Sequence, residues 1–189
     1  MEPETLNPEL LTALAMQDIY QRAKRIRLAI FDVDGVLTDG SLYYTDAGEE
    51  LKAFNVRDGH GMKMLQASGV RLAIITSRNA RCVELRAKNL GIDLLYQGVA
   101  DKLVAFRELL AQLGLDEAAS AFMGDDIVDL PVMRRCGLAL TVAEAPAAVK
   151  NQAHYISRTP GGRGAVREAC EIIMQAQGTL ESQIAPYLK

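Results

Sequence analysis

Short runs of apolar residues recur along the chain, and each run ends at glycine or polar residues. Four of them cover residues 28–31, 70–75, 121–123 and 138–142. Because these runs are almost continuously apolar, strands of this kind are typical of a parallel sheet that is buried on both faces. We therefore predict four core strands at these positions.

Between the predicted strands, apolar residues recur at helical spacing. One stripe consists of Leu103, Phe106, Leu109, Leu110 and Leu113. Gly114 follows it as the expected C-cap, and a second helix is predicted over residues 79–89, with Gly91 after it. Strands that alternate with helices in this way predict a doubly wound α/β domain with right-handed crossovers.

The N-terminal region predicts a helix that precedes the alternation. Asn7 suits the N-cap, Pro8 suits the first turn, and Glu9 complements the helix dipole. We expect this helix to run from residue 7 to about residue 25 and to pack outside the sheet.

Two further regions interrupt the alternation. Residues 41–54 alternate imperfectly around Asp46-Ala47-Gly48, which predicts a β-hairpin insert. Residues 159–164 are rich in glycine and lead into a helix that is expected to end near residue 178. A chain of 189 residues has the size of one ordinary domain, so residues 1–189 are expected to form a single one.

Composition and charge narrow the function classes. With 49% hydrophobic residues the chain is expected to be globular, and it has no apolar run near the roughly 18 residues that span a bilayer. The net charge of −3 gives no support for nucleic-acid binding, and the acidic start Met1-Glu2-Pro3-Glu4 is unlike a signal peptide. The three cysteines form no C-x-x-C pair: they are Cys82, Cys136 and Cys170. We therefore expect them to be core thiols and the protein to be cytoplasmic.

The first candidate for chemistry follows the strand at residues 28–31, which runs into Asp32-Val33-Asp34-Gly35. Ligands of open α/β sheets bind at the carboxyl ends of the strands. Two carboxylates one residue apart repel one another unless a cation joins them. The alternative is a loop that carries capping aspartates.

A second acidic cluster follows the strand at residues 121–123, in the string Gly124-Asp125-Asp126-Ile127-Val128-Asp129. Carboxylates gathered at two neighbouring strand ends make a hard, oxygen-rich site that suits Mg²⁺. An N-cap with a solvated acidic turn accounts for one of these aspartates but hardly for all three.

Two further positions complete the set. The strand at residues 70–75 delivers Thr76-Ser77-Arg78, and Lys102 stands near the start of a helix. Taken singly, Thr76 is a frequent type of strand-end residue and Lys102 a frequent type of surface residue. Together with the aspartates they supply a nucleophile, a metal site, a hydroxyl and a cation in order along the chain.

These motifs resemble those of the haloacid dehalogenase-like phosphohydrolases over residues of about 26–150. The strings DVDGVLTDG, GEELKAFNVRDG, YQGVADK and GGRGAVRE resemble more closely the 3-deoxy-D-manno-octulosonate 8-phosphate phosphatase family, over nearly the whole chain. Ser77 departs from the pattern, in which glycine is expected at this position.

The resemblance implies a division of labour among the aspartates. Asp32 is the expected nucleophile, which forms an aspartyl-phosphate. Asp34 is the expected general acid and base. The expected ligands of Mg²⁺ are the Asp32 carboxylate, the Asp34 main-chain carbonyl and Asp125, whereas Asp129 is expected to orient the site or hold Lys102.

The resemblance also implies substrate contacts. Thr76 and Lys102 are expected to hold phosphoryl oxygens. The full set of expected contacts is Asp34, Asn55, Val56, Arg57, Asp58, Gly59, Lys63, Arg78, Arg86 and Lys102. Residues 55–59 are expected in a loop before the next helix, and Arg86 and Lys63 fit a solvated helix face equally well.

The implied activity is hydrolysis of 3-deoxy-D-manno-octulosonate 8-phosphate in lipopolysaccharide precursor biosynthesis. The implied assembly is a homotetramer in which hairpins with Leu42, Tyr43 and Tyr44 pack together. Because the motifs fill residues 26–150, there is no room for a cap domain. Neighbouring subunits and the tail Gly161-Gly162-Arg163-Gly164 are expected to cover the active site instead.

Three other functions remain as alternatives. A phosphatase for a related nonulosonate 9-phosphate shares the scaffold. A signalling receiver module also has an acidic pocket, but its phosphoacceptor stands apart from the acidic pair, whereas Asp32 and Asp34 form a D-x-D. An inactive, oligomer-forming domain is disfavoured by the intact motif set.

Overall fold

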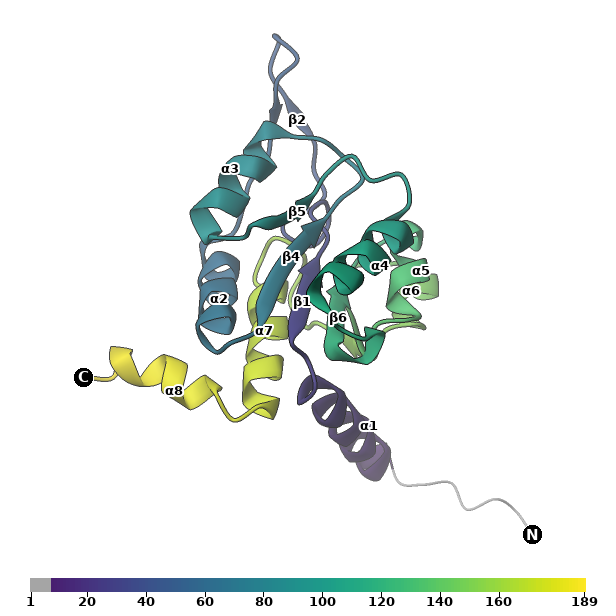
Figure 1. Cartoon of the computed structure of the whole chain (residues 1–189), viewed down its shortest axis with the longest axis vertical. Coiled ribbons are helices and arrows are strands. Elements are labelled where there is room, and N and C mark those ends of the chain that lie inside the picture. The colour runs from purple at the N-terminus through teal and green to yellow at the C-terminus, as the bar shows by residue number, and fades with distance from the viewer. Residues whose placement is uncertain (1–7) are drawn as a thin grey trace.

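A computed structural model describes residues 8–189 as a parallel sheet between two layers of helices (Figure 1). The strand order is β5-β4-β1-β6-β7-β8, and all five pairings are parallel. The strands are β1 (Leu28–Phe31), β4 (Arg71–Ile75), β5 (Leu94–Tyr96), β6 (Ser120–Met123), β7 (Leu138–Thr141) and β8 (Tyr155–Ile156). The predicted α/β class and the four predicted strands are confirmed, whereas β5 and β8 were not predicted.

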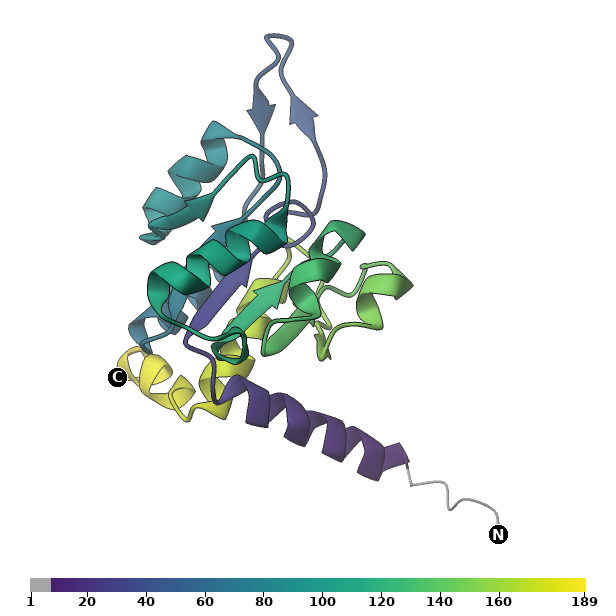
Figure 2. The same cartoon turned by 45° about the vertical axis from the view of Figure 1, so that its right-hand side comes forward.

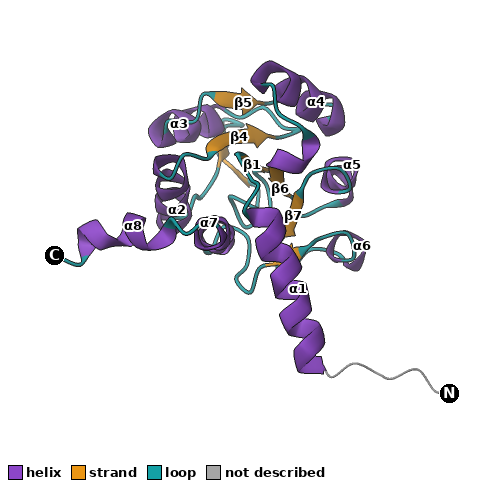
Figure 3. Cartoon of the chain, turned by 60° about the horizontal axis from the view of Figure 1, so that its bottom comes forward, coloured by secondary structure: helices purple, strands orange, loops and turns teal. Residues whose placement is uncertain are grey.

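Helices cover both faces of the sheet (Figure 3). One face carries α2 (Val56–Ala67), α3 (Arg81–Leu90) and α7 (Ala165–Ala176). The other carries α4 (Lys102–Leu113), α5 (Leu130–Met133) and α6 (Ala147–Lys150). The glycines that follow α3 and α4 are left-handed, with φ of +71° at Gly91 and +63° at Gly114, so the predicted C-cap Gly114 is confirmed and Gly91 ends α3 in the same way.

The N-terminal and C-terminal helices lie near the amino ends of the sheet strands. Helix α1 (Pro8–Ala23) packs against α7 and β7 and projects away from the body (Figure 2). It falls within the predicted helix, while the predicted N-cap Asn7 lies outside the described residues. Helix α7 is followed by α8 (Leu180–Ile184) and the 3₁₀ turn η3 (Ala185–Tyr187), which were not predicted. Within residues 8–189, no helix is long and apolar enough to cross a membrane.

The predicted hairpin is present but short. Strands β2 (Tyr43–Tyr44) and β3 (Glu50–Leu51) pair antiparallel within the predicted range of 41–54. Figures 1 and 2 show the hairpin standing above the carboxyl ends of the sheet strands, at the end opposite α1. It therefore rises from the edge at which the candidate residues lie.

The strand order reverses direction beside β1, and this reversal positions the site. The chain winds outward through β4 and β5, then returns to add β6, β7 and β8 on the other side of β1. Phe31 at the end of β1 lies opposite both Ile74 of β4 and Met123 of β6. The ends of these three strands are thus level, and the crevice between them is where ligands bind in folds of this kind. Two short 3₁₀ turns border the later strands, η1 (Glu117–Ala119) and η2 (Ile127–Asp129).

Candidate active site

Asp32 stands at the point where the sheet order reverses. It follows β1 directly, and its main-chain N–H donates to the Met123 carbonyl of β6 at 3.0 Å. Its carboxylate is buried, and one oxygen accepts from the Val33 N–H at 2.7 Å. The level strand ends bring Thr76, after β4, and Asp125, after β6, to the same crevice.

Lys102 inserts its ammonium between two buried carboxylates. Its Nζ lies 2.7 Å from Asp32 Oδ2 and 2.6 Å from Asp129 Oδ1. Asp129 is fully engaged, because its other oxygen accepts from the main-chain N–H groups of Asp125 at 3.0 Å and Asp126 at 3.1 Å. The contact expected between Asp129 and Lys102 is therefore present.

The site carries more negative than positive charge. Burial, reinforced by the Asp129 charge, raises the pKa of Asp32 to about 6. Burial and then the Asp32 and Asp129 charges raise the pKa of Asp125 to about 7. Burial disfavours the Lys102 ammonium, but the two carboxylates raise the pKa of Lys102 overall. One cation among three carboxylates leaves a net negative site, which a divalent cation would balance.

The donor geometry fits such a cation. Oxygens of Asp32, Asp125 and Asp129 lie within 4.8 Å of one another. Asp129 is occupied by Lys102 and two N–H groups and does not line the pocket, whereas Asp32 and Asp125 do, so these two are the carboxylates left to face an ion. Gly35 allows their approach: it adopts φ +83°, and a Cβ there would stand 2.0 Å from Asp125 Oδ2. Hard carboxylate oxygens suit Mg²⁺ rather than a softer metal.

A pocket of about 250 Å³ opens over these groups. Its lining residues are Asp32, Asp34, Gly40, Thr76, Ser77, Arg78, Lys102, Asp125, Asp126 and Val128. The structure therefore brings together the predicted nucleophile, general acid, hydroxyl, cation and metal ligands. Ser77, the departure from the expected pattern, is exposed in the same lining.

Asp34 is held by the base of the hairpin, which sequence reasoning did not foresee. Lys52 Nζ contacts Asp34 Oδ1 and also Glu50 Oε1. Glu50 in turn accepts from the Arg78 guanidinium at 2.9 Å, and Arg78 also donates to the Tyr44 hydroxyl at 2.9 Å. In the sequence, Glu50-Leu51-Lys52 has the polar and apolar alternation of a solvated hairpin, so no local signal indicated that the Glu50 and Lys52 side chains are turned inward while Leu51 is exposed.

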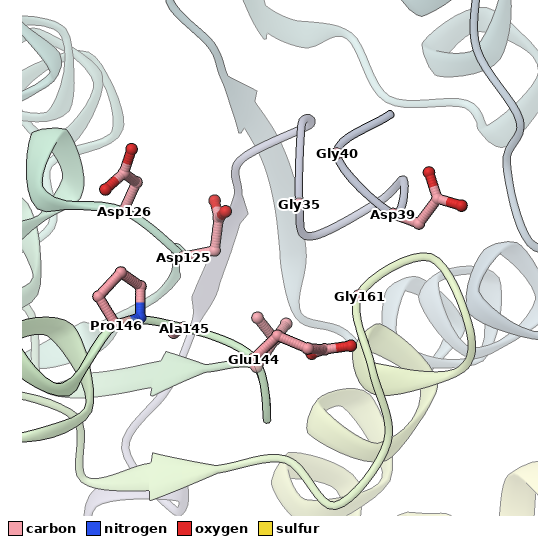
Figure 4. A pocket seen from close by; sticks show the side chains of 10 residues that line it. Gly35, Asp39, Gly40, Asp125, Asp126, Glu144, Ala145, Pro146 and Gly161 are labelled. Atoms are coloured by element: carbon pink, nitrogen blue, oxygen red, sulfur yellow. The ribbon is translucent and has the colours of Figure 1, made fainter. Parts of the chain in front are cut away.

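A second hollow, of about 300 Å³, lies on the other side of Asp125 (Figure 4). Figure 4 shows Gly161 of the tail bordering it opposite Asp125 and Glu144. Gly161 packs so tightly on the Gly35 loop that a Cβ would stand 1.8 Å from the Gly35 carbonyl oxygen. Gly162 N–H donates to the Val36 carbonyl at 2.9 Å. The tail of this chain therefore supports its own active-site loop.

Comparison with known proteins decides the family. Residues 94–168 match the haloacid dehalogenase-like hydrolase family. The 3-deoxy-D-manno-octulosonate 8-phosphate phosphatase KdsC of Yersinia pestis is 54% identical over 87% of this chain and 88% of its own length. The Escherichia coli K12 phosphatase of the same name is 49% identical over 87% of each chain. The chain belongs to the 3-deoxy-D-manno-octulosonate 8-phosphate phosphatase family.

Solved structures of this phosphatase family share the fold. The Yersinia pestis enzyme superposes with a TM-score of 0.85 at 54% identity, covering 87% of this chain and 89% of that one. The Moraxella catarrhalis enzyme, in complex with magnesium ion, phosphate ion and KDO, gives 0.89 at 44% identity, covering 91% and 99%. The resemblance found in the motifs is thereby confirmed.

Not all substrate contacts expected for a phosphatase of this family reach the pocket. Residues 55–59 do not form a loop, and this part of the prediction is wrong: Asn55 is the N-cap of α2, and its side chain accepts from the Arg57 N–H at 2.8 Å. Buried Asp58 accepts from the N–H groups of Gly164 at 3.2 Å and Arg167 at 2.8 Å. Asp58 therefore fastens the tail and the start of α7 to α2.

The remaining expected contacts also lie apart from the pocket lining. Arg86 donates to the Asn55 carbonyl at 3.0 Å, and its guanidinium lies over the Phe54 ring at 5.6 Å. Lys63 is exposed on α2, and Val56 is 83% exposed at the start of that helix. Within this one described chain, these residues lie on α2 and α3, outside the lining of the phosphate pocket.

Proposed function

We propose that this chain is a Mg²⁺-dependent phosphatase that hydrolyses 3-deoxy-D-manno-octulosonate 8-phosphate to the free sugar acid and phosphate, in lipopolysaccharide precursor biosynthesis. The observation that carries the proposal is the buried Asp32 carboxylate beside Lys102, at the base of a pocket that also contains Asp34, Thr76 and Asp125. The identity to relatives named for this activity supports the substrate.

The residues supply a two-step displacement. An Asp32 oxygen forms a bond to phosphorus while the bond from phosphorus to the sugar oxygen breaks, and Asp34 gives that oxygen its proton. Asp34 then takes a proton from water, which attacks the phosphorus and releases Asp32. Lys102 and Thr76 hold the phosphoryl oxygens, where charge is concentrated in the transition state.

The cation belongs to the same proposal. Its proposed ligands are the Asp32 and Asp125 carboxylates and the Asp34 main-chain carbonyl, because Asp129 is already occupied. When bound, Mg²⁺ supplies the positive charge that lets an anionic nucleophile meet an anionic ester.

The sugar acid carries a carboxylate besides the phosphate, so it needs a second cationic group. Arg78 lines the pocket and is 42% exposed, which leaves its guanidinium accessible despite the contact with Glu50. We propose that Arg57, Lys63 and Arg86 contribute contacts across a subunit boundary, together with Asn55 and Val56, whereas Asp58 and Gly59 are buried and do not reach it. The exposure of Arg57 and Lys63 on α2 supports this, because it leaves their charges accessible to another subunit.

The hairpin also supplies the proposed contact between subunits. The hairpin exposes Leu42, Tyr43, Tyr44 and Leu51 at 46–58%, an apolar surface that supports packing of hairpins in a homotetramer. The cysteines are free thiols, as is usual for a cytoplasmic protein. Sedimentation of the wild type and of Tyr43→Glu tests the assembly: a tetramer that the substitution dissociates is expected, and a wild-type monomer would overturn it.

Kinetics on two sugar acids test the activity. Phosphate release is measured from 3-deoxy-D-manno-octulosonate 8-phosphate and from a nonulosonate 9-phosphate, each with and without Mg²⁺. We expect Mg²⁺-dependent turnover with the higher kcat/KM on the octulosonate. A higher kcat/KM on the nonulosonate would overturn the choice of substrate, and turnover that survives chelation would overturn the cation.

A further inference from the structure

Lys52 is a buried cation beside the phosphate pocket. Its side chain is 1% exposed, although the hairpin before it exposes Tyr43, Tyr44 and Leu51. Burial disfavours the ammonium, but contacts with Asp34 and Glu50 raise the pKa of Lys52 overall. A buried lysine is costly unless it is paired, and this one is paired on two sides.

The two oxygens of Asp34 have different surroundings. Lys52 contacts Oδ1, whereas Oδ2 accepts no hydrogen bond from any described residue, and its nearest cation is Arg78 Nε at 3.9 Å. Asp34 lines the phosphate pocket next to Asp32. Lys52 thus fixes one oxygen, while the other has no hydrogen bond from the described residues.

Glu50 completes the arrangement by fixing Lys52 itself. It lies on β3, contacts the Lys52 ammonium and accepts from Arg78 at 2.9 Å. Hydrogen bonds from Arg78 and then Lys52 lower the pKa of Glu50, so it remains a carboxylate. The order of contacts, from Asp34 through Lys52 and Glu50 to Arg78, joins the hairpin to the phosphate pocket.

We propose that Lys52 is a positioning residue for the general acid: it holds Asp34 Oδ1 so that Oδ2 meets the leaving oxygen of the substrate. The inference rests on the proposed function, because it assigns Asp34 the proton that the sugar oxygen receives. It gives the hairpin a part in catalysis within its own chain, in addition to any part in assembly.

Substrates with different leaving groups separate this positioning role from a general loss of activity. A sugar alkoxide needs the proton from Asp34, whereas the phenolate of p-nitrophenyl phosphate leaves without one. For Lys52→Met we expect kcat on the sugar acid phosphate to fall by about 100-fold, as for loss of general acid catalysis, with a fall of less than about 5-fold on p-nitrophenyl phosphate. Lys52→Arg, which keeps the charge, is expected to recover most of the loss on the sugar ester.

Controls keep the inference open to refutation. Lys88→Met removes an exposed lysine from α3 and is expected to change neither rate. If Lys52→Met does not fold, the charge-balanced Glu50→Gln/Lys52→Met is measured instead, with the same selective loss expected. Equal losses on both esters, or no loss on either, would overturn the positioning role. Wild-type turnover of the sugar acid phosphate tests the proposed function separately. If that ester is not the substrate, the effect of Lys52→Met can still be measured by comparing p-nitrophenyl phosphate with any alkyl phosphate that the enzyme hydrolyses.

Discussion

The Lys102 ammonium lies 2.7 Å from the Asp32 carboxylate, and their side chains are only 2% and 9% exposed. Removing one partner of such a buried pair leaves the other charge without compensation, at a cost of about 3–5 kcal/mol. For Lys102→Met we therefore predict a loss of activity together with a fall of that size in the free energy of unfolding, measured by urea denaturation at neutral pH. Lys88→Met, at an exposed position, should stay within about 0.5 kcal/mol of the wild type. An unfolding free energy for Lys102→Met equal to that of the wild type would contradict the pairing.

The raised pKa of Asp125 predicts how the stability of the metal-free protein depends on pH. Its pKa is about 7 in the folded protein, above the ordinary value of 3.8. The folded state therefore binds this proton more tightly than the unfolded state, so the stability it contributes is present at low pH and is lost as pH rises through about 7. In chelator, Asp125→Asn should match the wild type in melting temperature near pH 4 and exceed it at pH 8.

At pH 8, Mg²⁺ should give the wild type a higher melting temperature than Asp125→Asn. Protons and Mg²⁺ compete for the same carboxylates, so the ion should raise the melting temperature of the wild type more at pH 8 than at pH 5.5. Asp125→Asn should respond weakly at both values. Asp93→Asn, an exposed change of the same kind, should follow the wild type. A wild type that melts at the same temperature with Mg²⁺ and with chelator at pH 8 would speak against the site.

Gly35 allows a prediction about geometry rather than charge. An alanine there would adopt φ +83° and place its Cβ 2.0 Å from Asp125 Oδ2, so Asp125 must move. Since a displacement of about 1 Å at a reacting group can cost about 100-fold, we expect Gly35→Ala to lose kcat/KM on that order. Gly114→Ala is the matched control, with φ +63° but open space around the Cβ, and should lose about 1–2 kcal/mol of stability while activity is retained. Equal activity in the two variants would contradict the close packing at residue 35.

Asp58 predicts a stability effect away from the pocket. Asn at this position cannot accept from both the Gly164 and Arg167 N–H groups, because one of its two groups is a donor. A buried donor left unsatisfied costs about 1–3 kcal/mol, and Asp58→Asn should lower the free energy of unfolding by about that amount. Unchanged stability with a raised KM would show instead that the carboxylate contacts substrate directly.

Much of the fold could be predicted because the central strands are continuous apolar runs. The predicted run at residues 28–31 coincides with β1, and the ends of the other three runs differ from the strands by one residue at most. The edge strands escaped prediction for a physical reason. β5 and β8 have only three and two residues and are partly exposed, so neither has the length and burial of the central strands.

Some residues of the candidate site could likewise be predicted from the sequence, and others could not. Asp32, Thr76 and Asp125 could be predicted because each directly follows, or nearly follows, an apolar strand, and the ends of parallel strands meet. Lys52 could not be predicted, since its burial arises from the way the hairpin folds back over Asp34. The role of Asp58 was likewise hidden, because its two partners lie more than 100 residues along the chain.

Phosphate release by Asp32→Asn tests the central claim most directly. The substitution keeps the size of the side chain but replaces the nucleophilic oxygen that Lys102 contacts with an amide. With saturating Mg²⁺ and 3-deoxy-D-manno-octulosonate 8-phosphate, we predict a kcat at least about 1,000-fold below that of the wild type, as is usual for loss of a covalent nucleophile. An Asp32→Asn protein, free of wild-type contamination, that releases phosphate at the wild-type rate would contradict covalent catalysis at this residue.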